Sequence, residues 1–140
     1  MDKRILAVDG VNLAGLLFVV LGLVNCVVAP LFTMEEIFKQ LYPESAHVVL
    51  YNVMGTGIAT AFCGSLLMYA SRHMRTAQWW AWRIAWRVTW FLLILGAGGI
   101  VAMWQNPFAE ILAVLDLILL FVLIKSQAVL KGNALKEWPK

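Results

Sequence analysis

Four long stretches of the chain are almost continuously apolar, and short polar segments separate them. They cover about residues 10–32, 46–70, 79–105 and 107–130. A helix of roughly 17–25 apolar residues is long enough to cross the hydrocarbon core of a bilayer. The pattern therefore predicts an all-α, polytopic membrane protein. We expect residues 1–140 to form one domain, a bundle of four transmembrane helices.

The segment between the first two stretches has a different pattern. Thr33 and Glu36 have the spacing of a capping box, and Ile37, Phe38 and Leu41 then fall on one apolar face. This pattern predicts a short amphipathic helix that lies on the outer surface of the membrane and connects the first two transmembrane helices.

Composition and charge agree with a membrane protein and indicate its orientation. The chain is 62% hydrophobic and 14% charged, whereas soluble domains are about half apolar and about a quarter charged. Basic residues collect on the cytoplasmic side of membrane proteins. All basic residues except Lys39 would then lie on the same side of the membrane. They are Lys3, Arg4, Arg72, Arg75, Arg83, Arg87, Lys125, Lys131, Lys136 and Lys140. We therefore expect an integral protein of the bacterial cytoplasmic membrane with both termini in the cytoplasm, and we read the net charge of +3 as a topological signal. It does not indicate a nucleic-acid partner.

One carboxylate interrupts the last apolar stretch, in "AVLDLILLF", residues 113–121. Counted along the helix, Asp116 lies about 15 Å below the outer boundary, with Asn25 about 12 Å and Asn52 about 10 Å deep. A charged aspartate near the bilayer centre costs about 2.5–3.5 kcal/mol, so it should face the bundle and either find a donor or be protonated. We expect Asp116 to donate to an amide or to be held by Asn25 and Asn52.

Further polar residues are expected above this layer, at the outer mouth of the bundle. His47 and Tyr51 are four residues apart and share a helix face. Together with Asp116 they are the candidate catalytic residues, with Asp116 as proton donor or acceptor. The candidate ligand-binding residues are Asn25, Asn52, Glu36 and Glu110. The alternative is that these polar groups hold the helices together by hydrogen bonds.

Tryptophans are concentrated at the start of the third stretch, in "WWAWRIAWRVTW", residues 79–90. A three-to-four spacing predicts one stripe along the helix, with two arginines beside it. It is typical of an aromatic belt at the membrane interface, and the alternative is a docking strip for an anionic lipid head group or a partner subunit. The residues concerned are Trp79, Trp82, Trp86, Trp90, Arg83 and Arg87.

Several kinds of chemistry are not indicated. Cys26 and Cys63 are expected in different membrane layers, so they should not form a disulfide, and there is no Cys-x-x-Cys motif. His47 and His73 are expected on opposite sides of the membrane, which excludes haem ligation by both. We predict no metal site, and the sequence motifs do not indicate a particular cofactor.

The chain resembles the DoxX-like class of small bacterial membrane proteins, because it combines four short helices, cytoplasmic termini and a few polar residues in the outer half, such as Asn25 and Asp116. The resemblance implies a subunit or partner of a membrane redox system. The small multidrug exporters also have four helices, but they carry an essential acid in helix 1, where this chain has Asn25.

Two hypotheses follow. In the first, a polar pocket in the outer half of the bundle binds or transforms a lipophilic molecule such as a quinone, isoprenoid or sterol-like compound. In the second, the protein is a non-catalytic accessory subunit of a larger membrane complex and docks through its tryptophan-rich helix. The expected partners are the lipid bilayer, a lipophilic small molecule, and further copies of the chain or a larger complex. Whether the protein is an enzyme stays open.

Overall fold

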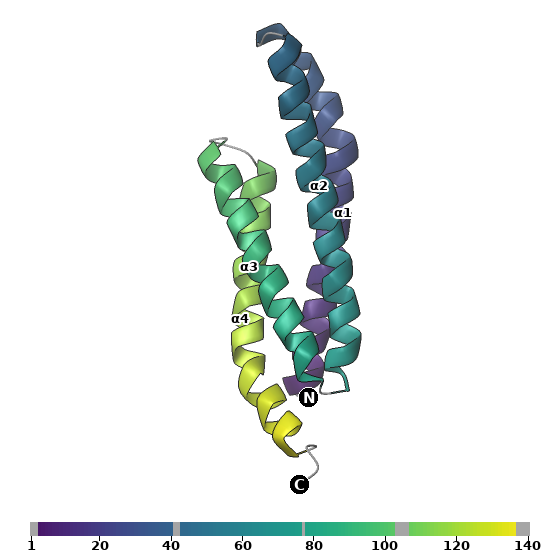
Figure 1. Cartoon of the computed structure of the whole chain (residues 1–140), viewed down its shortest axis with the longest axis vertical. Coiled ribbons are helices and arrows are strands. Elements are labelled where there is room, and N and C mark those ends of the chain that lie inside the picture. Colours follow the sequence, from purple (N-terminus) through teal and green to yellow (C-terminus); the bar gives the residue numbers. More distant parts are fainter. Residues whose placement is uncertain (1–2, 41–42, 77, 103–106, 137–140) are drawn as a thin grey trace.

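Four α-helices make up the part of the chain that the structure describes. The computed structural model describes residues 3–40, 43–76, 78–102 and 107–136, and within these ranges the side chains of residues 5–27, 31, 47–76, 78–101 and 107–127. The helices are α1 (Lys3–Gln40), α2 (Pro43–Met74), α3 (Trp79–Ala102) and α4 (Pro107–Lys136) (Figure 1). The predicted all-α fold is confirmed.

Each helix is long and apolar enough to cross a membrane. The candidate spans are Ile5–Val27, His47–Met74, Trp79–Val101 and Pro107–Gln127. Many of their large apolar side chains point away from the bundle, for example Val20, Ile58, Val101 and Phe121. In a soluble protein a surface of this kind would associate, whereas in a bilayer the acyl chains cover it. The protein is therefore an integral membrane protein.

The helices form two antiparallel hairpins, α1–α2 and α3–α4, that pack side by side. Each helix packs against two neighbours, so that α2 adjoins α3 and α4 adjoins α1. The start of α1 and the end of α4 lie at the same end of the bundle, here called the terminal end (Figure 1). At the opposite, distal end, α1 and α2 extend beyond α3 and α4, and the two hairpins diverge.

The core lies mainly in the terminal half, where the hairpins are close together. All four helices contribute fully buried side chains to it: Phe18, Leu67, Leu92 and Leu119. The two hairpins therefore pack against each other mainly at the terminal end of the bundle.

The helix bounds correct the sequence-based prediction in several places. The prediction of a separate amphipathic helix is wrong, because α1 continues through Pro30 and Thr33 to Gln40. A proline inside a helix removes one hydrogen bond, but helices of membrane proteins often tolerate this loss. Helices α2 and α4 extend beyond the predicted bounds as well, since α2 begins at Pro43 and α4 continues to Lys136, whereas α3 is described within its predicted bounds.

Candidate ligand-binding site

A cavity of about 400 Å³ lies between the two hairpins in the distal half of the bundle. Three polar residues line the side formed by α1 and α2, namely Asn25, Asn52 and Thr56. Apolar residues of α3 and α4 line the opposite side, among them Phe91, Ile94, Leu95, Phe108, Ala109 and Leu112. All four helices therefore contribute to the site, and its lining is largely apolar with polar groups on one side.

The glycines of "GAGG", residues 96–99, explain how α3 can border both α4 and an open space. A Cβ atom added to Gly99 would lie 2.9 Å from the Cβ of Ala109, and one added to Gly96 would lie 3.3 Å from the backbone nitrogen of Ala113. These two glycines allow α3 to approach α4 closely. Gly98 lines the cavity, and an added Cβ would have no atom within 4 Å.

The polar side of the cavity is organised by hydrogen bonds to the backbone of α2. The Nδ2 atom of Asn25 donates to the carbonyl oxygen of Val53 at 3.0 Å, and the hydroxyl of Thr56 donates to the carbonyl oxygen of Asn52 at 2.7 Å. Asn25 is buried and held in place, whereas the Asn52 side chain is exposed. An amide carries both donors and an acceptor, so Asn52 presents hydrogen-bonding groups to a molecule in the cavity.

Asp116 is completely buried, but it does not line the cavity. It is 0% exposed, and neither carboxyl oxygen has a hydrogen-bond partner within the described part of the chain. Leu112, one turn earlier on the same face of α4, lines the cavity and lies between it and Asp116.

The predicted contact of Asp116 with Asn25 and Asn52 is wrong. A Cβ added to Gly10 would lie 3.5 Å from Val122 of α4, which places Asp116 opposite the region of residue 16 on the antiparallel α1. Asn25 is then about nine residues, or ~13 Å, further toward the distal end. Equal depths would require the two hairpins to end at the same level, but α1 and α2 extend further than α3 and α4 (Figure 1).

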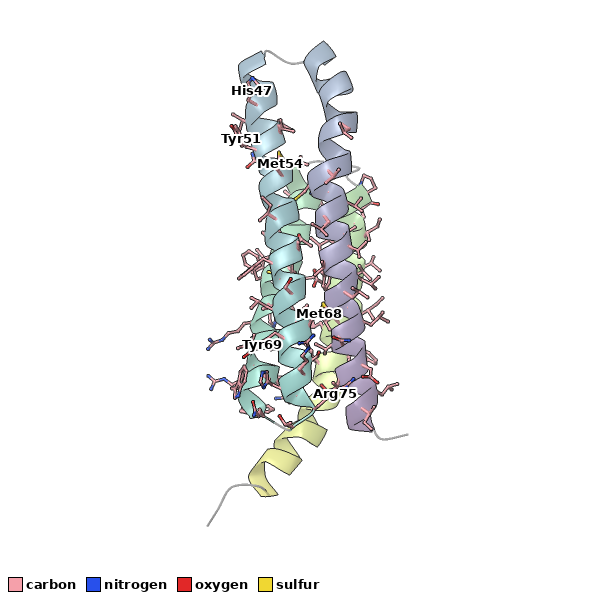
Figure 2. The ribbon with its side chains drawn as sticks, turned by 90° about the vertical axis from the view of Figure 1, so that its right-hand side faces the viewer. His47, Tyr51, Met54, Met68, Tyr69 and Arg75 are labelled. Carbon is pink, nitrogen blue, oxygen red and sulfur yellow. The ribbon has the colours of Figure 1, made fainter. Side chains whose placement is uncertain are left out.

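The described outer residues that were expected at the mouth of the bundle do not line the cavity. His47 and Tyr51 lie near the distal end of α2 (Figure 2), where Tyr51 is 77% exposed. Glu110 on α4 is also exposed, and none of the three is part of the cavity lining. The side chain of Glu36 lies outside the described residues. Their catalytic and ligand-binding roles stay predictions.

The tryptophan row of α3 faces the core at three of its four positions. Trp79 and Trp82 stack with ring centroids 4.6 Å apart, and Trp82 and Trp86 stack at 5.3 Å. Trp82 is 6% exposed, and its Nε1 atom donates to the carbonyl oxygen of Leu123 on α4 at 3.2 Å. The interpretation of this row as a lipid or partner surface is therefore wrong for Trp82, which joins α3 to α4.

The exposed face of α3 instead presents a tryptophan that the sequence analysis did not select. Trp80 and Trp90 are 41% and 43% exposed, and Arg83 and Arg87 are exposed on the same side of the helix. The spacing 80, 83, 87, 90 also follows helical periodicity, and its two arginines are the signal that could have identified this side as exposed, because an unpaired charge is costly to bury.

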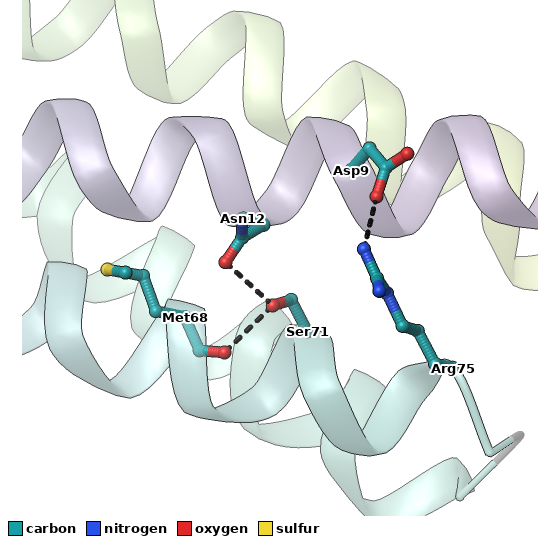
Figure 3. A network of polar contacts seen from close by, with 5 residues as sticks. All are labelled: Asp9, Asn12, Met68, Ser71 and Arg75. Carbon is teal, nitrogen blue, oxygen red and sulfur yellow. Dashed lines mark hydrogen bonds and ion pairs between the residues drawn. The ribbon is translucent and has the colours of Figure 1, made fainter.

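A polar network at the terminal end was also missed. Arg75 of α2 donates to Asp9 of α1 at 2.7 Å, and the hydroxyl of Ser71 lies 3.2 Å from Oδ1 of Asn12 and 2.8 Å from the carbonyl oxygen of Met68 (Figure 3). Both charged side chains are more than half exposed, so the ion pair contributes little to stability. The network fixes the register of α1 and α2 at the end opposite to the cavity.

The described residues do not assemble a site for a metal ion, because no group of three or more His, Cys, Asp and Glu side chains comes together among them. Cys26 and Cys63 are both free thiols. Comparison with known proteins adds no assignment, since no family, no curated protein and no solved structure matches this chain. The resemblance to DoxX-like proteins stays a prediction.

Proposed function

We propose that this protein binds a lipophilic small molecule in the cavity between its two hairpins. The observation that carries the proposal is the cavity itself, with a volume of about 400 Å³. Ligand sites typically have volumes of about 300–1,000 Å³, a mostly apolar lining and a few placed polar groups. The apolar side formed by α3 and α4 and the amides of Asn25 and Asn52 fit this description.

The lining also supports a class of ligand. Phe91, Ile94 and Phe108 offer a surface for an isoprenoid chain or a fused ring system. Asn52 can donate to a carbonyl oxygen or accept from a hydroxyl group. A quinone, an isoprenoid alcohol or a sterol-like molecule combines one such polar group with a large apolar body. The described lining contains no charged side chain, which favours a neutral ligand.

The proposal is limited to binding and does not include proton transfer by Asp116. The carboxyl lies one turn beyond Leu112 and outside the cavity lining. A general acid or base must reach the reacting group directly or through one water. The proton-transfer role expected for Asp116 would require Leu112 to move aside, and it stays a prediction.

For orientation, we propose that the terminal end faces the cytoplasm. Arg72, Arg75, Arg83, Arg87 and Lys125 all belong to the halves of their helices that lie at this end. The excess of basic residues supports a cytoplasmic position under the positive-inside rule. The cavity then opens in the outer half of the membrane.

The experiment that tests binding compares two glycines that both have room for a larger side chain. Gly98 lines the cavity and Gly55 does not, and a Cβ atom added to either meets nothing within 4 Å. Gly98→Leu should therefore fill the cavity without disturbing the fold, and Gly55→Leu is the matched control. A native mass spectrum of each protein is recorded in detergent, first of the protein as extracted and then with added short-chain ubiquinone, farnesol or cholesterol.

We expect the wild-type chain and Gly55→Leu to carry a small-molecule adduct, or to bind one of the three probes, and Gly98→Leu to lose it. Thermal unfolding of both variants, followed by circular dichroism, checks that they are folded. Equal binding by a folded Gly98→Leu variant would place the ligand elsewhere. If the wild type carries no adduct and binds no probe, the proposed function is wrong.

The subunit hypothesis needs a different surface from the one the sequence suggested. Trp82 is buried against α4, so its replacement would test folding and not docking. A partner that docks on α3 would have to contact the exposed side chains Trp80 and Trp90. Assembly with further copies or a larger complex stays a prediction.

A further inference from the structure

The lipid-facing side of α3 carries two arginines between two tryptophans. Trp80, Arg83, Arg87 and Trp90 are three or four residues apart, all four are exposed, and they form one stripe along the helix. We call these four residues the arginine stripe. The residues on the opposite side, such as Trp82 and Ala85, are buried in the core.

The two arginines of the stripe have no anionic partner in the described part of the chain. The sequence of α3 contains no Asp or Glu. At the terminal end Asp9 is already paired with Arg75, at 2.7 Å. Asp116 on α4 is 0% exposed, so its carboxyl is not available to the exposed side of α3. Two guanidinium groups therefore face outward without a counter-ion from the described residues.

The depth of the stripe makes this lack of a counter-ion important. Arg87 is eight residues after the start of α3 at Trp79, which corresponds to about 12 Å along the helix. A guanidinium group at that level must reach back to the head groups of the bilayer, because its charge is costly in the acyl chain region. Arg83, one turn closer to the terminal end, is placed to reach the same layer.

The tryptophans of the stripe are held by contacts with their neighbours. The Trp80 ring lies 5.0 Å from the ring of His73 and 6.3 Å from that of Tyr69, both on α2. Tyr69 lies toward the terminal end of α2 (Figure 2). At the other end of the stripe, the Trp90 ring packs edge-on against Trp86 at 6.0 Å. Indole rings at the level of the head groups are typical of membrane interfaces, and Trp80 at the start of α3 is placed in this layer, whereas Trp90 lies deeper than Arg87.

We propose that the arginine stripe binds an anionic phospholipid of the leaflet at the terminal end. The guanidinium groups of Arg83 and Arg87 hold its phosphate, since a guanidinium can form paired hydrogen bonds with phosphate oxygens. The acyl chains lie against the exposed ring of Trp90 and extend from there toward the middle of the bilayer. This inference is independent of the ligand in the cavity.

Native mass spectrometry of the full chain tests the proposal, with an equimolar mixture of phosphatidylglycerol and phosphatidylcholine in the detergent. The ratio of the two lipids retained by the protein is measured for the wild type, Arg83→Gln, Arg87→Gln and the double variant. Lys125→Gln is the matched control, because Lys125 is an exposed cation on α4 that lies over the Phe121 ring. Unfolding in phosphatidylcholine alone checks that each variant is folded.

We expect the wild type to retain phosphatidylglycerol preferentially. Each arginine removed should lower this preference about five-fold, the factor expected for one basic residue near an anionic surface, and Lys125→Gln should change it less than two-fold. The proposal is wrong if the wild type shows no preference, or if Lys125→Gln lowers it as much as the arginine variants do. Co-purification of a polypeptide only while both arginines are present would also overturn the proposal, because a protein partner would then occupy the stripe. Gly98→Leu should leave the lipid ratio unchanged, so the test is separate from that of the cavity.

Discussion

At the scale of single residues, two buried polar side chains in the bundle contrast with each other. Asn25 donates a hydrogen bond to the carbonyl oxygen of Val53, whereas both carboxyl oxygens of Asp116 lack a partner within the described residues. A buried polar group without a partner costs about 1–3 kcal/mol, while one that is hydrogen-bonded contributes modestly to stability. Removing the two polar groups should therefore change the free energy of unfolding in opposite directions.

The substitution Asp116→Val should raise the free energy of unfolding by about 1–3 kcal/mol, because it removes an unpaired polar group. The substitution Asn25→Val should lower it by about 0.6 kcal/mol, the average contribution of a hydrogen bond between membrane helices. Titration of each protein with dodecyl sulfate, followed by circular dichroism, measures both changes. A large loss of stability in Asp116→Val would mean that the carboxyl has a bonding partner.

At the scale of helices, glycines determine how closely α1 and α2 approach each other. A Cβ atom added to Gly22 would lie 2.5 Å from the backbone nitrogen of Ala61 and 2.5 Å from the carbonyl oxygen of Gly57. Backbone atoms cannot move aside as a flexible side chain can. In lipid, where helices associate mainly by close packing, this contact is a major part of what holds the first hairpin together.

The substitution Gly22→Ala should lower the free energy of unfolding by about 1–3 kcal/mol, because α1 and α2 must separate to accommodate the methyl group. Gly55→Ala serves as the control, since an added Cβ there meets no atom within 4 Å. That change should be neutral or stabilise by up to about 1 kcal/mol through higher helix propensity. The same unfolding titration measures both, and equal effects would argue against the close helix contact.

Helix α3 shows how much of the site the sequence could predict. Its span was predicted from hydropathy, and the side of the membrane on which its arginines lie was predicted from the distribution of charge. Periodicity alone does not separate the row of Trp79, Trp82 and Trp86 from the stripe that contains Trp80 and Trp90. The two arginines were the available signal for the exposed side, because an unpaired charge is costly to bury.

At the scale of the whole molecule, the antiparallel arrangement places both chain ends at one end of the bundle (Figure 1). With the proposed orientation, a fluorescent protein fused to either terminus should fluoresce in bacterial cells, and alkaline phosphatase fused there should be inactive. Phosphatase inserted after Gln40, at the end of α1, should be active, because the distal end would face the periplasm. The opposite pattern of activities would reverse the proposed orientation.

The sequence by itself determined the number of membrane spans and the side on which the termini lie relative to one another. Both follow from the lengths of the apolar stretches, which must match the thickness of a bilayer.

The tertiary structure alone decided which polar residues meet. Asn25, Asn52 and Asp116 were predicted in one layer, but the longer first hairpin places the two asparagines at the cavity and Asp116 behind Leu112. The relative offset of two hairpins depends on contacts between helices far apart in the chain, such as Gly10 with Val122. Local hydropathy carries no record of these contacts, because lipid and protein interior are similarly apolar.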